Sequence, residues 1–176
     1  MSKLAKTILI TGASTGFGRD TAETLTREGN SVFASFRDIA GRNKSHAEAL
    51  RRAGINVVEL DVTNNNSVEG AVSNVLSRAG RIDVLVNNAG IASAGVSEAF
   101  TAEQVRDLFE VNVFGIQRVL RAVLPTLRNQ RDGLVINVGS ILGRITFPFF
   151  GLYGASKHAV EALTDSYRYE LSPHDG

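Results

Sequence analysis

Two kinds of hydrophobic pattern alternate along the chain, and this alternation is the strongest constraint on its fold. Short apolar runs rich in β-branched residues are typical of buried strands, and they cover or begin the segments 6–11, 31–36, 55–62, 82–90 and 133–140. Helical patterns follow these runs at residues 18–29, 45–54, 67–80, 102–130 and 152–171. Because the connections are short, the alternation predicts an α/β fold whose parallel sheet carries helices on both faces. Right-handed crossovers restrict it to a doubly wound topology.

Composition excludes several functional classes. A chain of 176 residues with 43% apolar and 21% charged residues is expected to form one domain, residues 1–176. The net charge of +1 gives no strong field for nucleic acid, and the first apolar run is too short to cross a membrane. Cysteine is absent, which fits a reducing compartment such as the cytoplasm. The 3 histidines have no ligand spacing, so no metal site is predicted.

A glycine-rich segment, "TGASTGFG" (11–18), lies between the first strand and the first helix. Glycines at 12, 16 and 18 allow positive φ angles and close backbone approach. The helix that follows presents free N–H groups and a positive dipole end to a phosphate. The spacing G-x3-G-x-G alone could be a structural turn, but its position after a strand and before a helix favours phosphate binding.

The end of the second strand bears on the choice of dinucleotide. A carboxylate there would bind the ribose 2′-hydroxyl of NAD, whereas an arginine would accept the 2′-phosphate of NADP. The sequence "SFRD" (35–38) places Phe36 at the expected acidic position and Arg37 after it, with Arg42 and Lys44 nearby. These residues favour NADP(H) over NAD(H). A solvated basic loop is the alternative, and Asp38 would supply a carboxylate if the register shifted.

A third pattern, "YGASK" (153–157), places Tyr153 and Lys157 four residues apart on one helical face. A free phenol has a pKa near 10, and a nearby cation favours its ionised form. Such a pair can also arise by chance. However, Ser140 ends the fifth strand and "NNAG" (87–90) ends the fourth, so both lie at the edge of the sheet where ligands bind. Asn112, in "EVNVFG", lies inside a long helix although asparagine is a poor helix former.

The ordered motifs T-G-x3-G-x-G, N-N-A-G, N, S and Y-x3-K resemble those of the short-chain dehydrogenase/reductase family, in its compact tyrosine-dependent branch. The resemblance implies a Rossmann-type fold and a reaction between an alcohol and a ketone or aldehyde. It implies that Tyr153 is the general acid/base and that Lys157 lowers its pKa and holds the nicotinamide ribose. Ser140 would stabilise the developing oxyanion, and Asn112 would kink its helix and position a proton-relaying water.

The same resemblance implies a set of residues that bind the cofactor. Besides Tyr153 and Lys157, these are Gly12, Ser14, Thr15, Gly16, Phe17, Gly18, Arg37, Asp61, Val62, Asn88, Ala89 and Gly90. Asp61 and Val62 would contact the adenine, and residues 88–90 would border the ribose. The family also pairs the helices at 102–130 and 152–171 with their copies, which predicts a homodimer or homotetramer. Both helices carry apolar residues on more than one side.

The sequence departs from the family pattern at its C-terminal end. Family members continue with a sixth strand, a segment that meets the nicotinamide, a lid over the substrate and a seventh strand. The domain is therefore expected to lack the last strands of the family fold, with strand 133–139 at an edge and most of the substrate pocket missing. A non-catalytic dinucleotide-binding or dimerising module is the alternative function for such a chain.

An apolar segment, "ILGRITFPFFGL" (141–152), separates Ser140 from Tyr153. It predicts an apolar substrate, but its side chains could equally pack the loop or a subunit contact. Arg144 within it could anchor an anionic group or could simply be exposed. The particular substrate and the direction of the reaction do not follow from these residues.

Overall fold

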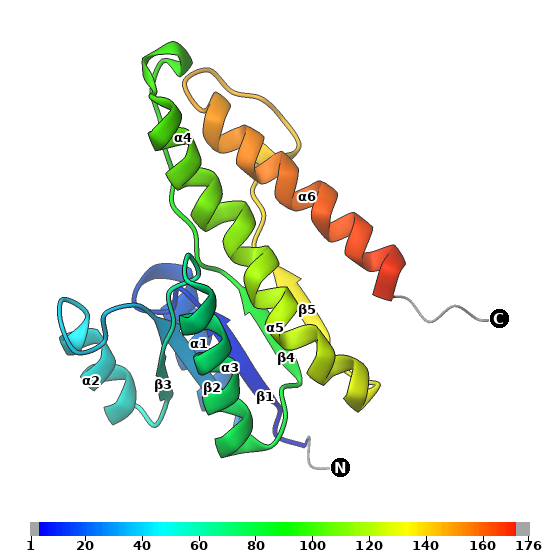
Figure 1. Cartoon of the computed structure of the whole chain (residues 1–176). Helices are drawn as coiled ribbons and strands as arrows, with labels where there is room; N and C mark the ends of the chain where they lie inside the picture. Colours follow the sequence, from blue (N-terminus) through cyan, green and yellow to red (C-terminus); the bar gives the residue numbers. More distant parts are fainter. Residues whose placement is uncertain (1–3, 172–176) are drawn as a thin grey trace.

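The computed structural model describes residues 4–171; the predicted domain also includes residues 1–3 and 172–176, which lie outside the described residues. A single parallel sheet of 5 strands in the order β3-β2-β1-β4-β5 forms its centre (Figure 1). The strands are β1 (Thr7–Thr11), β2 (Ser31–Phe36), β3 (Asn56–Glu59), β4 (Val84–Asn87) and β5 (Leu134–Asn137). The chain steps outward from β1 in both directions, so the predicted doubly wound, Rossmann-type topology is confirmed.

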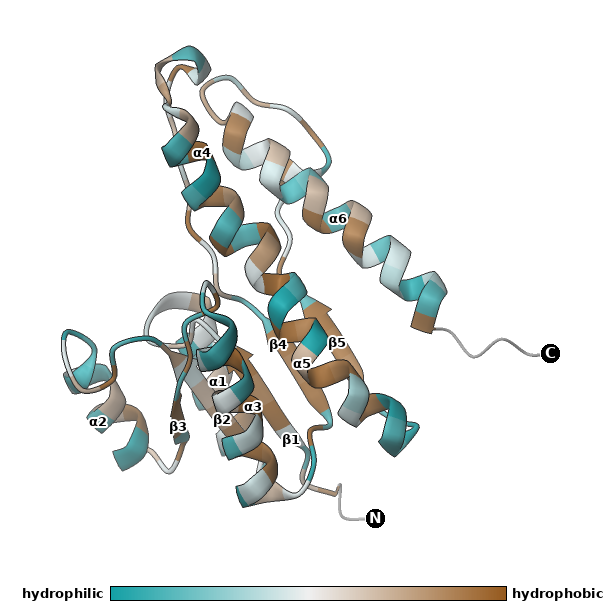
Figure 2. Ribbon diagram, viewed as in Figure 1, coloured by the Kyte–Doolittle hydropathy of each residue, from teal (hydrophilic) through white to brown (hydrophobic). Residues whose placement is uncertain are grey.

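Helices pack against both faces of this sheet because the strand residues alternate in direction. Ile8 and Ile10 belong to a buried cluster with α1 (Gly16–Arg27) and α2 (Lys44–Arg52). Leu9, between them, belongs to a second cluster with α3 (Asn65–Ala79) and α5 (Gly115–Gln130). Figure 2 shows the apolar strands between these helices, whose polar residues lie outward.

The helix predicted at 102–130 is interrupted. α4 (Ala102–Phe109) passes into a π-helical turn, η2 (Glu110–Phe114), before α5 begins. The stretch is thus helical as predicted, but its winding changes at the turn that contains Asn112. A π turn holds one residue more than an α turn and is common at functional sites. Here it contains Asn112, the residue whose presence in a helix was unusual.

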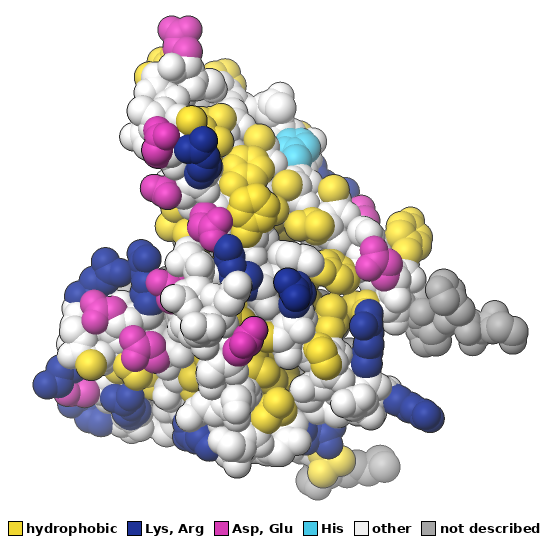
Figure 3. All heavy atoms as spheres, viewed as in Figure 1, with side chains coloured by type: hydrophobic (Ala, Val, Ile, Leu, Met, Phe, Trp, Pro, Cys, Tyr) yellow, Lys and Arg dark blue, Asp and Glu magenta, His cyan; other side chains and the backbone are white. Residues whose placement is uncertain are grey.

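The carboxyl-terminal part of the described chain leaves two surfaces open. β5 pairs only with β4 within residues 4–171, and Leu134 and Ile136 are 53% and 42% exposed. The last helix, α6 (Gly151–Leu171), contacts α4, the π turn and a 3₁₀ turn, η3 (Ile141–Gly143). Figure 3 shows hydrophobic side chains gathered over α4 and α6, and Phe114 in the π turn is 50% exposed.

Candidate functional site

The glycine turn after β1 is shaped by close approach as well as by backbone angles. Gly12 and Gly16 have φ of 66° and 56°, a region that favours glycine. A Cβ at Gly12 would lie 2.6 Å from the Ala89 Cα, and one at Gly18 would lie 2.8 Å from the Gly12 carbonyl oxygen. Side chains at these positions would therefore force the turn away from the loop that follows β4.

Hydrogen bonds hold that loop against the glycine turn. The backbone N–H groups of Asn88 and Ala89 both donate to Thr11 Oγ1, each at 3.1 Å. The Asn88 side chain donates from Nδ2 to the carbonyl oxygens of Thr11 (2.9 Å) and Gly12 (3.0 Å). Thr11 was not among the predicted site residues, although its place as the last strand residue before the turn was a usable signal.

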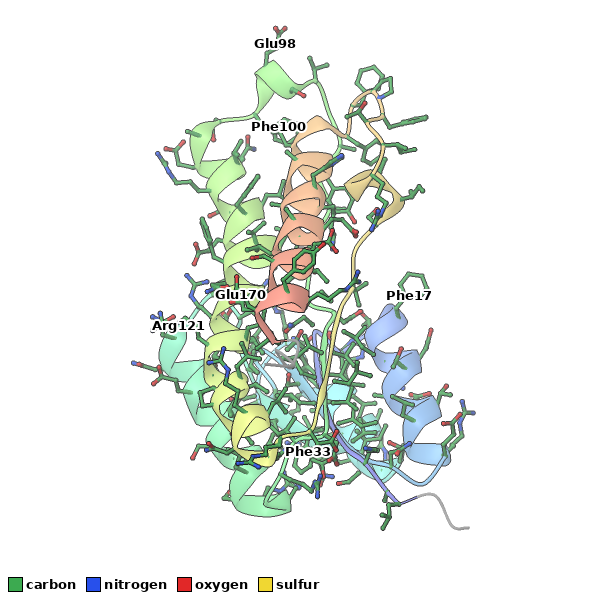
Figure 4. The ribbon with its side chains drawn as sticks, turned by 90° about the vertical axis from the view of Figure 1, so that its right-hand side faces the viewer. Phe17, Phe33, Glu98, Phe100, Arg121 and Glu170 are labelled. Carbon is green, nitrogen blue, oxygen red and sulfur yellow. The ribbon has the colours of Figure 1, made fainter. Side chains whose placement is uncertain are left out.

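A cavity of about 480 Å³ opens at the carboxyl edge of the sheet. Most of the residues predicted to bind the cofactor line it, namely Gly12, Ser14, Thr15, Phe17, Gly18, Arg37, Asp61, Val62, Asn88, Ala89 and Gly90. Gly16, Tyr153 and Lys157 are not among its lining residues. The Phe17 ring projects outward from the start of α1 and is 83% exposed (Figure 4).

One end of the cavity is basic. Arg37, Arg42 and Asn43 line it, together with the buried ring of Phe36. Asp38 is not a lining residue; its carboxylate accepts a hydrogen bond from the Arg42 backbone N–H (3.1 Å) and pairs with the Arg42 Nε at 3.8 Å. The carboxylate that could have served a ribose hydroxyl is thus bound within its own loop.

Asp61, another lining residue, is held in its ionised form. Burial opposes ionisation, but hydrogen bonds from Thr63 and the positive charges of Arg37 and Arg118 outweigh it and lower the pKa of Asp61. Thr63 donates from both its backbone N–H (2.9 Å) and its hydroxyl (2.7 Å) to Asp61 Oδ1. The carboxylate therefore fixes the turn after β3.

α6 brings Tyr153 and Lys157 to the same face. The Lys157 Nζ lies 5.9 Å from the Tyr153 ring centroid and donates to the Val138 carbonyl oxygen at 2.8 Å. Lys157 is only 6% exposed. Burial lowers the pKa of Lys157, and the nearby Glu161 carboxylate partly opposes this effect. The contact between Lys157 and Val138 was not predicted, because the sequence of a strand does not show which backbone carbonyl lacks a partner in the sheet.

Asn112 joins three segments from within the π turn. Its Oδ1 accepts from the Ile91 N–H (2.9 Å), and its Nδ2 donates to the Ile91 carbonyl (2.9 Å) and to Ser156 Oγ (3.1 Å). Ser156 in turn donates to the Tyr153 carbonyl oxygen at 2.7 Å. Ser156 is fully buried and was missed, although its spacing of three residues from Tyr153 places it near the same helical face.

Ser140 caps the η3 turn, since its Oγ accepts from the Leu142 N–H at 3.1 Å. A Cβ at Gly143, in that turn, would lie 2.9 Å from the Lys157 carbonyl oxygen, so η3 packs directly on α6. Within residues 4–171, no hydrogen bond joins Ser140 to Tyr153. The structure therefore brings Ser140 to the element that packs beside the Tyr/Lys pair, without a hydrogen bond to the tyrosine.

The apolar segment after Ser140 is largely open. Ile141, Ile145, Phe147 and Phe149 are 70%, 49%, 60% and 63% exposed, so they do not pack the interior of the loop. Arg144 pairs with Glu161 at 2.7 Å, so this arginine already has an anionic partner.

Residues 4–171 contain no cluster of acidic, histidine or cysteine side chains that could hold a metal ion. No helix in the same range is long and apolar enough for a membrane span.

The strand order and the glycine turn at the carboxyl edge match the arrangement found in dinucleotide-binding domains. The sequence profile of the short chain dehydrogenase family matches residues 6–175. The chain belongs to that family. It is 41% identical over 166 residues to the 3-ketodihydrosphingosine reductase of Bacteroides thetaiotaomicron, covering 94% of this chain and 58% of the reductase.

Solved structures of the family share the fold. The F189W actinorhodin polyketide ketoreductase with NADPH superposes with a TM-score of 0.89 at 32% identity, over 96% of this chain and 66% of that one. A Burkholderia phymatum short chain dehydrogenase/reductase in complex with NAD gives 0.89 at 32% identity, over 98% and 62%. The chain thus spans about three-fifths of the lengths of these relatives.

Proposed function

We propose that the protein containing this chain is an NADP(H)-dependent oxidoreductase that interconverts an apolar alcohol and its ketone or aldehyde. The observation that carries this proposal is the buried Lys157 beside Tyr153, on the helix that packs next to Ser140. Family membership supports an oxidoreductase reaction. The cofactor, when bound, would provide the hydride chemistry.

Tyr153 is the proposed general acid/base. A phenol with a pKa near 10 exchanges protons poorly at neutral pH, and a positive charge nearby favours its ionised form. Lys157 lies beside the tyrosine, with its Nζ 5.9 Å from the ring centroid. We assign Ser140 to the substrate oxygen and Asn112 to holding the helix and a relaying water. In this structure the Asn112 side chain bonds Ile91 and Ser156.

The preference for NADP(H) is supported by the basic end of the cavity. Arg37 and Arg42 line it, whereas the Asp38 carboxylate is bound in the loop and Phe36 occupies the expected acidic position. A guanidinium forms charge-assisted hydrogen bonds with a phosphate. Both cofactors occur in the family, as the ketoreductase with NADPH and the Burkholderia structure with NAD illustrate.

The exposed side chains between Ser140 and Tyr153 support an apolar substrate. Ile141, Ile145, Phe147 and Phe149 would lose contact with water if a ligand or a subunit covered them. The relative named as a 3-ketodihydrosphingosine reductase fits a substrate with a keto group.

We also propose a homodimer or homotetramer through 102–130 and 152–171, which monomeric sedimentation at micromolar concentration would contradict. A cytoplasmic location stays a prediction.

Replacing Tyr153 by phenylalanine in the full protein tests the reaction. One oxygen is lost while the ring is kept, so folding and NADPH binding should persist and turnover of a ketone should fall by about 100-fold or more. Tyr169→Phe is the matched control, because Tyr169 lies on the same helix and is 75% exposed. Equal turnover of the two variants would contradict the catalytic assignment.

The alternative is a dinucleotide-binding or dimerising module without catalysis. The cavity favours cofactor binding by this chain because its lining comes from residues 12–111, whereas the proposed catalytic residues lie beside η3 and α6. An oxidoreductase would consume NADPH in the presence of a ketone, whereas a binding module would bind NADPH without consuming it. Turnover of NADPH with a panel of ketones, measured at the nicotinamide absorbance band, separates the two functions.

A further inference from the structure

Arg118, on α5, bonds three residues from two separate segments at once. Its Nε donates to Asn65 Oδ1 at 3.0 Å and its Nη1 to the Val62 carbonyl oxygen at 3.2 Å. Its Nη2 forms an ion pair with Glu110 at the start of the π turn. The side chains of Arg118 and Glu110 are 23% and 35% exposed, so this pair is partly shielded from water. The rigid guanidinium fork suits such simultaneous contacts.

Gly115 provides an independent contact between the same two parts of the molecule. A Cβ at Gly115 would lie 2.9 Å from Val62 Cγ2 and 3.0 Å from Val62 Cβ. The φ of Gly115 is −59°, an ordinary helical value, so backbone conformation does not require glycine here. The absence of a side chain instead allows the start of α5 to lie directly against Val62.

Val62 connects these contacts to the cavity. Asp61, Val62 and Thr63 form part of the cavity wall, whereas Arg118 and Gly115 do not line it. Arg118 bonds both ends of the segment 62–65, namely Val62 and Asn65, the first residue of α3. Val62 is 8% exposed and packs within the core that includes Ile116 and Val119 of α5.

We propose that Arg118 and Gly115 are positioning residues that hold the loop 61–65 against α5 in the conformation that receives the adenine of the dinucleotide. This role rests on the proposed cofactor, because residues 61 and 62 are the proposed adenine contacts. A loop held in its binding conformation loses less conformational freedom when the ligand binds. The positive charge of Arg118 also helps to lower the pKa of Asp61.

The test compares two arginines of one helix. Arg118→Met keeps the length of the side chain and removes every donor, whereas Arg121→Met alters an exposed residue that bonds no other residue within 4–171 (Figure 4). The probes are NADPH and 2′,5′-ADP, which carries the adenine end alone. We expect Arg118→Met to weaken 2′,5′-ADP binding by about tenfold, through loss of charged hydrogen bonds. Arg121→Met should bind it as the unmodified chain does.

Gly115→Ala provides a second variant with a different cause, because its methyl group would push Val62 into the cavity wall. It should also weaken 2′,5′-ADP binding, and hydrogen exchange of residues 60–66 should be faster in both variants than in Arg121→Met. Affinities of Arg118→Met and Gly115→Ala equal to that of Arg121→Met would overturn the positioning role and leave the proposed cofactor intact. Failure of the unmodified chain to bind either nucleotide would overturn the proposed cofactor, and this role with it.

Discussion

Replacement of Asn112 by alanine should destabilise the protein more than most single substitutions. The change removes three side-chain hydrogen bonds. Both backbone groups of Ile91 lose their partner, and the Ser156 hydroxyl loses the donor to its oxygen while keeping its own bond to the Tyr153 carbonyl oxygen. Asn112 is 1% exposed and Ser156 is fully buried, so water does not readily replace those partners. A buried polar group left without a partner costs about 1–3 kcal/mol. Ile91 is 42% exposed, and we expect water to reach one of its groups.

These terms give a loss of about 2–4 kcal/mol in the free energy of unfolding. Urea unfolding followed by far-UV circular dichroism measures it directly. Asn74→Ala is the control, because Asn74 is exposed on α3 and its replacement should change stability by less than about 0.5 kcal/mol. A loss below about 1 kcal/mol for Asn112→Ala would refute the idea that this side chain holds the π turn to the loop after β4.

Three further predictions concern the cofactor loop and the buried lysine. Arg37→Ala should weaken NADPH more than NADH in parallel titrations, and equal weakening would remove the support for NADP. Gly12→Ala should destabilise the chain by about 2 kcal/mol more than Gly29→Ala in urea unfolding, because both have positive φ but only the first meets a neighbouring Cα, at 2.6 Å. Burial lowers the pKa of Lys157 below 10.5. Between the folded-state pKa and 10.5, the unfolded chain therefore binds more protons than the folded chain. The free energy of unfolding, relative to that of Lys157→Met, should rise with pH in that window. A difference that stays flat in a pH series of urea unfolding would contradict this assignment.

The parts of the fold that depend on short-range pattern were predictable. Strand runs and helical periodicity placed every strand of the sheet, and the edge position of 133–139 followed from the strand order. Boundaries were less accurate. β3 covers only Asn56–Glu59 of the predicted 55–62, because its pairing with β2 ends at Phe36↔Glu59 and the chain then turns toward α3.

The site was predictable where residues act through their type and position along the chain. The glycine turn and residues 88–90 share one cavity wall because each follows a strand that ends at the same edge. Partners that depend on three-dimensional approach were not predictable. Arg118 meets Val62 only because Gly115 lets α5 come close, and Lys157 meets Val138 only because α6 packs on η3.

The π turn also sets the rotational phase of one helix against the other. Leu108 in α4 and Ile116 in α5 are both buried, at 2% and 4% exposure, although they stand eight residues apart. In an unbroken α-helix, eight steps of about 100° would leave the two side chains about 80° out of line. The extra residue held in Glu110–Phe114 makes the spacing equivalent to seven steps, which reduces the offset to about 20°.

One inserted residue therefore brings Leu108 of α4 nearly into line with the buried stripe of α5. The stripe continues through residues of α5 that are all buried, namely Ile116, Leu120, Val123 and Leu127. Deleting one residue from 110–114 would restore ordinary helical winding and turn the whole of α4 by about 100° relative to α5. Leu108 would then leave the core and the exposed face of α4 would enter it, so the length of this segment is constrained as strictly as its composition.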